Sequence, residues 1–221
     1  MIRRVIFLTL VGGVGFATLL ALGIWQMQRL AWKQSILDTI ESRIAAAPVA
    51  LPNAPSASAD SYRAVTVAGE IEPKELHVFW VTERAGAGYR VISSFVTRSG
   101  RRILLDRGFI RSADKASERP AGPAEITGNL LWPQEGDWTT PPPEVDSNIL
   151  YTRDLAYMAD QLNTEPLLVV AREGTRVPTP LPVTTEGIPN NHLQYAITWF
   201  LLALIWAVMT VTFLLRTRAK T

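Results

Sequence analysis

Two long apolar stretches, Val5–Ile24 and Ala196–Leu215, lie near the two ends of the chain, and neither contains a charged residue. Each covers about 20 positions, or roughly 30 Å as a helix, which is the thickness of the hydrocarbon core of a bilayer. The pattern therefore predicts two transmembrane helices. A cleaved signal peptide is the alternative for the first stretch, although this stretch is longer than the usual signal core of about 7–15 residues.

Between the two stretches, hydrophobic and polar residues alternate with the period of two that is typical of β-strands. The expected fold class is two transmembrane α-helices flanking a mainly antiparallel β (α+β) domain outside the cytoplasm, arranged as an open sheet or a small barrel. One short helix is predicted from Thr152 to Leu162. The predicted strands are residues 62–69, 76–82, 89–97, 102–110, 124–132 and 167–171.

Composition divides the chain into five segments. The two spans are expected at residues 1–24, with a short cytoplasmic start, and at residues 190–215. Residues 25–61 are predicted to form a helical extension and a linker, residues 62–189 the β-rich domain, and residues 216–221 a basic cytoplasmic tail.

The distribution of charge predicts the orientation of the spans. Arg216, Arg218 and Lys220 directly follow the second span, whereas residues 178–194 on its other side contain no Lys or Arg. Because positive residues favour the cytoplasmic side, both termini are expected in the cytoplasm and the main domain in the periplasm. The start of the chain shows no mitochondrial targeting pattern, which favours a multi-pass protein of a bacterial inner membrane.

The composition narrows the chemistry. The 221 residues include 22 Lys and Arg, 20 Asp and Glu, and no Cys. The basic surplus lies at the terminal tips, which argues against a nucleic-acid surface. Without Cys, the chain has no site for c-type haem attachment, no thioredoxin-like dithiol and no thiolate copper site.

One of only two histidines, His192, lies four residues before the second apolar stretch. On a helix, His192, Tyr195, Ala196, Trp199 and Ala203 share one face, because steps of three and four residues stay on one side. An imidazole beside two rings and two small residues is suited to a flat porphyrin, with His192 as axial ligand of the haem iron. The alternative is an ordinary hydrogen-bonded histidine at the membrane interface, where Tyr and Trp are common.

The first span ends in a matching polar position. Trp25 and Gln26 lie at its outer end, at the depth expected for His192, and are further candidates for the binding site. Gly15 and Gly23, with Leu19 between them, approximate a small-xxx-small pattern. Such patterns allow two helices, or a helix and a cofactor, to approach closely.

No catalytic group stands out. The second histidine, His77, lies in a predicted strand, where a half-buried sheet histidine is the expected role. Two histidines and no cysteine cannot build a multi-histidine metal site. The chain shows no Ser–His–Asp order, no paired-carboxylate spacing and no phosphate-binding glycine loop. The protein is therefore interpreted as a non-enzyme. The alternative is an enzyme of haem or envelope metabolism.

The order of motifs along nearly the whole chain resembles the Surfeit locus protein 1 family of cytochrome c oxidase assembly factors. Gly23–Lys33 is similar to the family's Gly-x-Trp-Gln-x-x-Arg-x-x-Trp-Lys element, and Tyr62–Gly69 to its first strand motif, with Ala64 where proline is common. Leu105–Ile110 is similar to its Asn-Arg-Gly-Trp-Val strand, with Asp for Asn and Phe for Trp. The most specific match is Asn190–Phe200.

The resemblance implies a factor that binds haem a and delivers it to, or stabilises it in, the large subunit of cytochrome c oxidase. It implies His192 as the iron ligand, with Tyr195, Trp199, Trp25 and Gln26 as neighbours. The expected partners are that subunit, the lipid bilayer and, as a further candidate, haem a synthase, but no nucleic acid. The alternative function is a membrane-tethered scaffold for oxidase subunits that does not carry haem.

Overall fold

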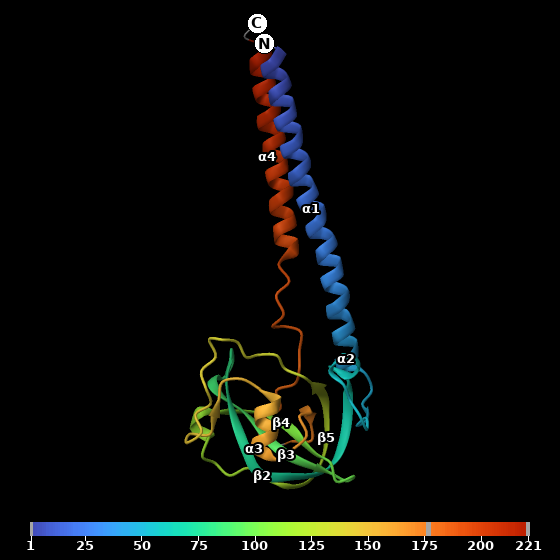
Figure 1. Ribbon diagram of the computed structural model, residues 1–221, viewed down its shortest axis with the longest axis vertical. Coiled ribbons are helices and arrows are strands. Elements are labelled where there is room, and N and C mark those ends of the chain that lie inside the picture. The colour runs from blue at the N-terminus through green and yellow to red at the C-terminus, as the bar shows by residue number, and fades with distance from the viewer. Residues whose placement is uncertain (1, 176–177, 220–221) are drawn as a thin grey trace. The chain divides into compact units, whose positions relative to one another are not determined.

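The computed structural model of the chain describes residues 2–175 and 178–219 (Figure 1). Met1, residues 176–177 and the last two residues of the predicted basic tail, Lys220–Thr221, lie outside the described residues. The chain divides into two compact units. Residues up to Thr39 and from Thr185 onward form one unit, called the helix unit below, and Ile40–Thr184 form the other, called the domain.

The elements follow the predicted order of helix, strands, short helix, strand and helix. In chain order they are α1 (Ile2–Ala45), β1 (Val49–Ala50), α2 (Ala57–Asp60), β2 (Ala64–Thr82), β3 (Gly86–Thr97), β4 (Arg102–Arg111), the 3-10 helix η1 (Ser112–Asp114), β5 (Gly122–Leu131), β6 (Ile149–Leu150), α3 (Leu155–Leu162), β7 (Leu168–Glu173) and α4 (His192–Ala219).

The helix unit consists mainly of α1 and α4, which are both long and apolar enough to cross a membrane. α1 has 44 residues and is therefore about 66 Å long. The predicted span ends at Ile24, but α1 continues beyond this position without a break. The end of an apolar stretch is a change in the polarity of the side chains and does not require a change in the backbone. Large apolar side chains such as Phe7 and Leu204 stay exposed along both helices. Two apolar helices at the ends of the chain confirm this part of the predicted fold class.

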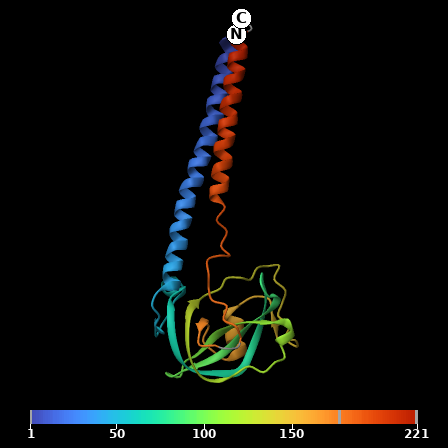
Figure 2. The ribbon, with the colours of Figure 1, turned by 180° about the vertical axis from the view of Figure 1, so that it is seen from behind.

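Small residues of α1 lie against large residues of α4, and Figures 1 and 2 show the two helices side by side. A methyl group built on Gly23 would lie 2.5 Å from the ring of Phe200, and one built on Gly15 would lie 2.5 Å from the indole nitrogen of Trp206. The same indole nitrogen donates a hydrogen bond of 3.0 Å to the carbonyl oxygen of Gly12. Close helix approach at glycine is the expected way for helices to associate in lipid.

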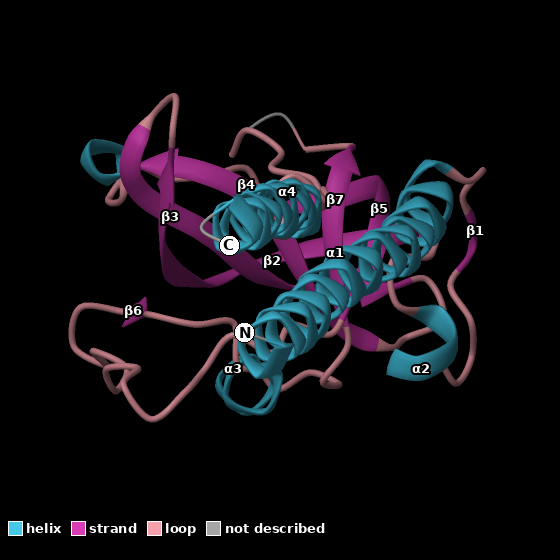
Figure 3. Ribbon diagram, turned by 90° about the horizontal axis from the view of Figure 1, so that it is seen from above, coloured by secondary structure: helices cyan, strands magenta, loops and turns pink. Residues whose placement is uncertain are grey.

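The domain is built on one sheet whose strand pairings form a closed circuit (Figure 3). β2 pairs with β3, β3 with β4, β4 with β7, β7 with β5, and β5 again with β2. Four of these five pairings are antiparallel and only β4–β7 is parallel. The two-residue strands β1 and β6 add parallel pairings at β2. The predicted class of a mainly antiparallel domain is confirmed.

The prediction of two separate strands at 62–69 and 76–82 is wrong, because β2 is a single strand of 19 residues. Its pairing with β3 is irregular between Ile71 and Glu75, so Pro73 lies where no regular ladder bond is needed. Its first half pairs with β5 as far as Ile71, and its second half pairs with β6. The two halves of β2 thus pair with different strands of the sheet.

Two apolar cores lie on the two faces of the central strands. In β4, Leu105 belongs to one core and its neighbour Leu104 to the other, and in β7 the same holds for Val169 and Leu168. Successive side chains of a strand point to opposite faces, so strands with two apolar faces are covered on both sides. Met158 of α3 belongs to the second core, and α3 therefore covers that face.

α3 begins three residues later than predicted. Asp154 is its N-cap, and the Asp154 carboxylate accepts hydrogen bonds from the backbone nitrogens of Ala156 and Tyr157. Asn163 ends the helix in the left-handed conformation, with φ of 53°. The predicted start at Thr152 is wrong because the aspartate, a strong N-cap residue, satisfies the free N–H groups of the first turn.

The last turn of α1 belongs to the domain and is bonded to the sheet. The carbonyl oxygen of Ile44 accepts hydrogen bonds of 3.2 Å from the Asn129 side chain on β5 and of 3.1 Å from Arg172 on β7. A helix leaves its last carbonyl oxygens without partners inside the helix. Here two strands supply the missing donors and fix the end of α1.

Candidate functional site

His192 is the first residue of α4, and its ring is held by Gln26 of α1. The two atoms His192 Nδ1 and Gln26 Oε1 lie 2.8 Å apart. An amide oxygen accepts hydrogen bonds and cannot donate them, so Nδ1 carries the hydrogen. In the neutral ring the lone pair then lies on Nε2. The contact therefore fixes both the tautomer and the orientation of the imidazole.

The second ring nitrogen of His192 is available. Among residues 2–175 and 178–219, no group forms a hydrogen bond with His192 Nε2. Gln26 is buried, while His192 is half-buried. A histidine that binds a metal commonly donates its other N–H to a polar neighbour, which raises its basicity and orients it. The His192–Gln26 pair has this arrangement.

The remaining sequence-predicted residues divide into two groups. Ala196 and Ala203 are buried and Trp199 is half-buried, as expected for the face of α4 that contacts α1. In contrast, Tyr195 and Trp25 are 55% and 53% exposed, so both rings lie on the outer surface of the helix unit. The structure thus brings His192 and Gln26 into contact and leaves two aromatic rings open to the surroundings.

One turn beyond Gln26 lies a cation, Arg29, to which the sequence analysis assigned no role in the site. The guanidinium carbon of Arg29 lies 3.8 Å from the centre of the Trp32 ring. Stacking on an indole restrains an arginine and keeps its N–H groups free to bind anions. The signal in the sequence was the Arg-x-x-Trp spacing, which puts the two side chains on one helix face.

The other histidine, His77 on β2, is built into the domain interior. It is 5% exposed, and its Nε2 lies 3.0 Å from Glu75 Oε1. Arg119 donates several hydrogen bonds to the same carboxylate, and Arg107 lies 3.8 Å from it. The prediction of a sheet histidine is confirmed, with deeper burial than expected.

The Glu75 cluster has a perturbed carboxylate. Burial is the largest influence and by itself would raise the pKa of Glu75, but hydrogen bonds from His77 and Arg119 outweigh it. The pKa falls from 4.5 to about 2. Glu75 is therefore ionised at neutral pH and acts as a structural anion rather than as an acid or base.

A second buried ion network surrounds Asp106 of β4. Asp106 is fully buried, and its carboxylate lies 2.6 Å from Arg90 Nε and 3.6 Å from Arg153 Nη1. Both guanidinium groups lie 5.1 Å from the Trp80 ring. Arg153 also pairs with Glu135, and although burial alone would raise the pKa of Glu135, these bonds hold it below its usual range. The network balances two cations with two anions, as buried charges require.

The described residues contain no cluster of side chains that is typical of a protein metal site. Within the described residues, no group of three or more His, Cys, Asp or Glu side chains could hold a metal ion. The His192 Nε2 atom is thus the candidate ligand position, with a single protein ligand as haem iron allows.

Comparisons of the sequence with known proteins show which proteins this chain is similar to. The family model described as "SURF1 family" matches residues 14–204, which include both Gln26 and His192. The chain is 30% identical over 205 residues to "Surfeit locus protein 1" of Xenopus tropicalis, covering 81% of this chain and 67% of that protein. It is 30% identical over 208 residues to the Homo sapiens protein of the same name, covering 83% and 69%.

A bacterial relative is similar over a larger share of both chains. The chain is 29% identical over 211 residues to the "SURF1-like protein" of Rickettsia prowazekii, covering 90% of this chain and 86% of that protein. The similarity thus extends across both apolar helices and the domain between them.

Proposed function

Because this chain belongs to the SURF1 family, we propose that it is an assembly factor for cytochrome c oxidase that binds haem a and delivers it to, or stabilises it in, the large oxidase subunit. The observation that carries the proposal is the hydrogen bond between His192 Nδ1 and Gln26 Oε1. It leaves Nε2 as an oriented ligand atom at the beginning of an apolar helix.

The residues present fit a haem. The haem iron takes an imidazole nitrogen as an axial ligand. Gln26 holds the ring, so little rotamer freedom of His192 is lost when Nε2 binds. The exposed rings of Trp25 and Tyr195 offer flat apolar surface near the ligand. Arg29, restrained on Trp32, is the cation on α1 that suits a haem propionate.

The packing of the helix unit supports an open site. Gly23, one turn from Gln26, lies so close to Phe200 that no planar ligand fits between the helices at that level. His192, Trp25 and Tyr195 would therefore hold haem a on the outer surface of the pair, which is open to a partner protein. A carrier must release its cargo, and an open face allows transfer to the oxidase subunit.

The proposed setting follows from charge. The basic residues at the end of the chain, from Arg216 onward, favour a cytoplasmic position of both termini, so the domain lies in the periplasm of a bacterial inner membrane. His192 then lies near the periplasmic surface of the bilayer. In this setting the large oxidase subunit and haem a synthase are the protein partners, and the protein itself catalyses no reaction.

The test is the absorption spectrum of the protein purified from cells that make haem a. We expect wild type to carry haem a, His192→Ala to lose most of it, and added imidazole to restore part of it by occupying the vacated ligand position. Gln194→Ala is the matched control, because it removes an exposed side chain from the same helical turn. An unchanged haem content in His192→Ala would overturn the ligand assignment.

A second function, a membrane-tethered scaffold that carries no haem, is favoured by the hydrogen bonds at Ile44. Asn129 and Arg172 fix the last turn of α1 to the sheet, so the helix that contains the first apolar stretch ends as part of the domain. Co-purification of the oxidase subunit with a haem-free wild-type protein, from cells rich in haem a, would support this function against the first.

A further inference from the structure

The loop between β5 and β6 displays an indole to solvent. Trp138 is 95% exposed, more than any other large apolar side chain that the structure describes, and Val145 in the same loop is 73% exposed. Isolated exposed apolar residues are common, but a tryptophan without any cover is a frequent anchor of protein interfaces. The exposed Trp138 therefore suggests that this loop binds a partner, and the structure of the loop indicates the chemistry of that partner.

Hydrogen bonds hold the backbone of the loop on both sides of Trp138. The Asp137 carboxylate accepts hydrogen bonds of 2.8 Å and 2.6 Å from the backbone nitrogen and the hydroxyl of Thr139. At the other end of the loop, Glu144 and Ile149 exchange two backbone hydrogen bonds of 2.8 Å and 3.0 Å. A loop backbone that is already ordered loses little conformational freedom on binding.

The same loop is acidic. Residues 133–148 contain four carboxylates and no Lys or Arg: Glu135, Asp137, Glu144 and Asp146. A hydrogen bond from Thr139 lowers the pKa of Asp137, and one from Tyr151 lowers the pKa of Glu144, so both stay ionised at neutral pH. Glu135 is paired with Arg153, and Lys115 donates a hydrogen bond to the Ser147 carbonyl oxygen, so the negative charge next to Trp138 comes mainly from the exposed Asp137. The loop is thus an apolar knob with an anion beside it, and it fits an apolar pocket with positive charge at its rim.

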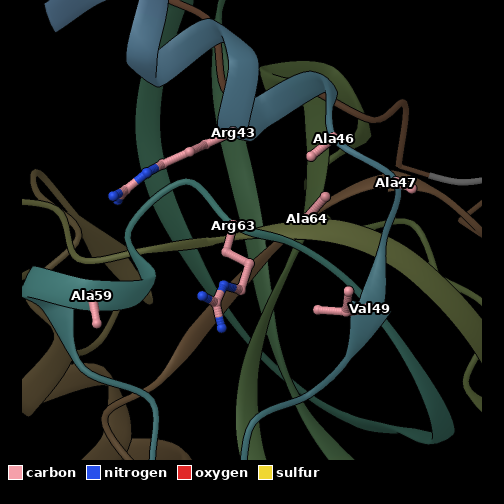
Figure 4. A pocket seen from close by; sticks show the side chains of 7 residues that line it. All are labelled: Arg43, Ala46, Ala47, Val49, Ala59, Arg63 and Ala64. Atoms are coloured by element: carbon pink, nitrogen blue, oxygen red, sulfur yellow. The ribbon is translucent and has the colours of Figure 1, made fainter.

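The domain itself contains such a pocket (Figure 4). Its volume is about 390 Å³, and it is lined by the guanidinium-bearing Arg43 and Arg63 and by five alanine or valine side chains, with Ala47 among them. Arg63 pairs with Asp60 at 2.8 Å, and Arg43 donates one bond of 3.3 Å to the Ser61 carbonyl oxygen. Two cations against one anion leave the pocket positive.

The knob and the pocket lie on opposite sides of the domain. Figures 1 and 3 both show the loop that leads into β6 on one side of the sheet and α2 with β1, which border the pocket, on the other. The two features therefore cannot meet within one molecule, but they can meet between neighbouring molecules.

We propose that the protein associates head to tail with a second copy of itself, the Trp138 loop of one copy seated in the Arg43–Arg63 pocket of the next. A tryptophan buries about 150–250 Å² on docking, and the pocket volume is at the lower end of the usual range for ligand sites of about 300–1,000 Å³. A contact between two different surfaces continues into rings or open chains. Anchoring in one bilayer raises the effective concentration of the copies.

The absence of natural cysteine makes a cross-linking test clean. Two differently tagged full-length chains are co-expressed in one membrane, one with Gly136→Cys beside the knob and one with Ala47→Cys at the pocket, and treated with a short bismaleimide. Glu83→Cys, at the far end of β2 from the pocket, replaces Ala47→Cys in the matched control. We expect a mixed dimer from the first pair and none above background from the control.

The role of the knob is tested in the same membranes. Adding Trp138→Ala should weaken association about 30-fold, the size of effect seen when an interface anchor is removed. Arg43→Gln with Arg63→Gln should weaken it as well, and raised salt should act in the same direction. Unchanged thermal unfolding of each variant shows that the domain is intact. The proposal is overturned by equal cross-linking in the two pairs, by attachment of position 136 to another protein instead, or by full association of Trp138→Ala.

Discussion

The two histidines of the chain lie in different surroundings in the two units. In the domain, His77 is buried and its Nε2 lies 3.0 Å from Glu75 Oε1, within a network of charges. In the helix unit, His192 is half-buried and bonds Gln26 through Nδ1, and no group among the described residues bonds its Nε2. The same side chain is a structural part in one place and a ligand candidate in the other.

The difference follows from the surroundings. The domain has a closed sheet, two cores and neighbouring charges for its buried polar groups, and it uses them for stability. The helix unit has few polar side chains, and in lipid each of them is costly unless it has a partner or a function. A half-buried imidazole at the start of an apolar helix is therefore stronger evidence for function than a buried one in the sheet. The comparison predicts that substitutions in the domain change stability, and those near His192 change binding.

The largest effect is expected in the domain, at Asp106. Asp106→Ala leaves Arg90 buried without its carboxylate, and removing one partner of a buried pair costs about 3–5 kcal/mol. The free energy of unfolding is measured by denaturant titration in detergent, with the exposed Asp114→Ala as control. A loss below about 1 kcal/mol would contradict the view that these charges stabilise the domain.

The next effect separates binding from stability. Gln26→Leu removes the acceptor that orients His192, and loss of such a partner lowers metal affinity about 10–100-fold. Haem titration followed by absorption measures the affinity, and the unfolding of the domain should not change. Gln28→Leu, an exposed change on the same helix, is the control. Equal haem affinity of Gln26→Leu and wild type would break the comparison.

Acid should act through the domain network. The pKa of Glu75 is lowered to about 2 in the folded protein from 4.5, so its stabilising contribution is complete above pH 4.5 and is lost as the pH falls towards 2. Unfolding free energies of wild type and Glu75→Gln, measured between pH 5 and pH 2, should converge as the pH falls. Parallel pH profiles for the two proteins would show that this carboxylate does not govern acid stability.

The smallest effect is expected within the helix unit. Trp206→Phe keeps an aromatic ring at the Gly15 contact but loses the hydrogen bond to the Gly12 carbonyl oxygen. Interhelical hydrogen bonds in lipid contribute about 0.6 kcal/mol on average. Thermal unfolding in detergent should shift slightly, compared with the exposed Met209→Leu as control. A loss of haem in Trp206→Phe would mean that the packing of α1 against α4, and not Gln26 alone, orients His192.

The sequence predicted the elements whose pattern is long and regular. Uncharged apolar runs identified both long terminal helices, and alternation identified the main strands of the circuit. It predicted two strands, at residues 62–69 and 76–82, where the structure has the single strand β2, whose pairing is irregular between Ile71 and Glu75. It also missed β1 and β6, since two residues carry no periodicity and are strands only through their pairing with β2.

For the site, the spacing predicted the face of α4 that carries His192 but not the contact of His192 with Gln26. Gln26 is 166 residues away, and the pairing depends on how α1 and α4 are rotated about their axes. That rotation is set by tertiary contacts such as Gly23 against Phe200. The role of Arg29 was missed for a related reason, since its stacking on Trp32 requires the side-chain rotamers and not only the spacing.

The hydrogen bonds at the end of α1 have a consequence for the order of folding. Asn129 and Arg172, which bond the Ile44 carbonyl oxygen, follow it by 85 and 128 residues. β7, which carries Arg172, also closes the strand circuit between β4 and β5. During synthesis from the N-terminus, α1 is complete long before either donor has been made. Because contacts of high sequence separation form slowly, α1 has time to form as an independent helix before the finished domain fixes its end.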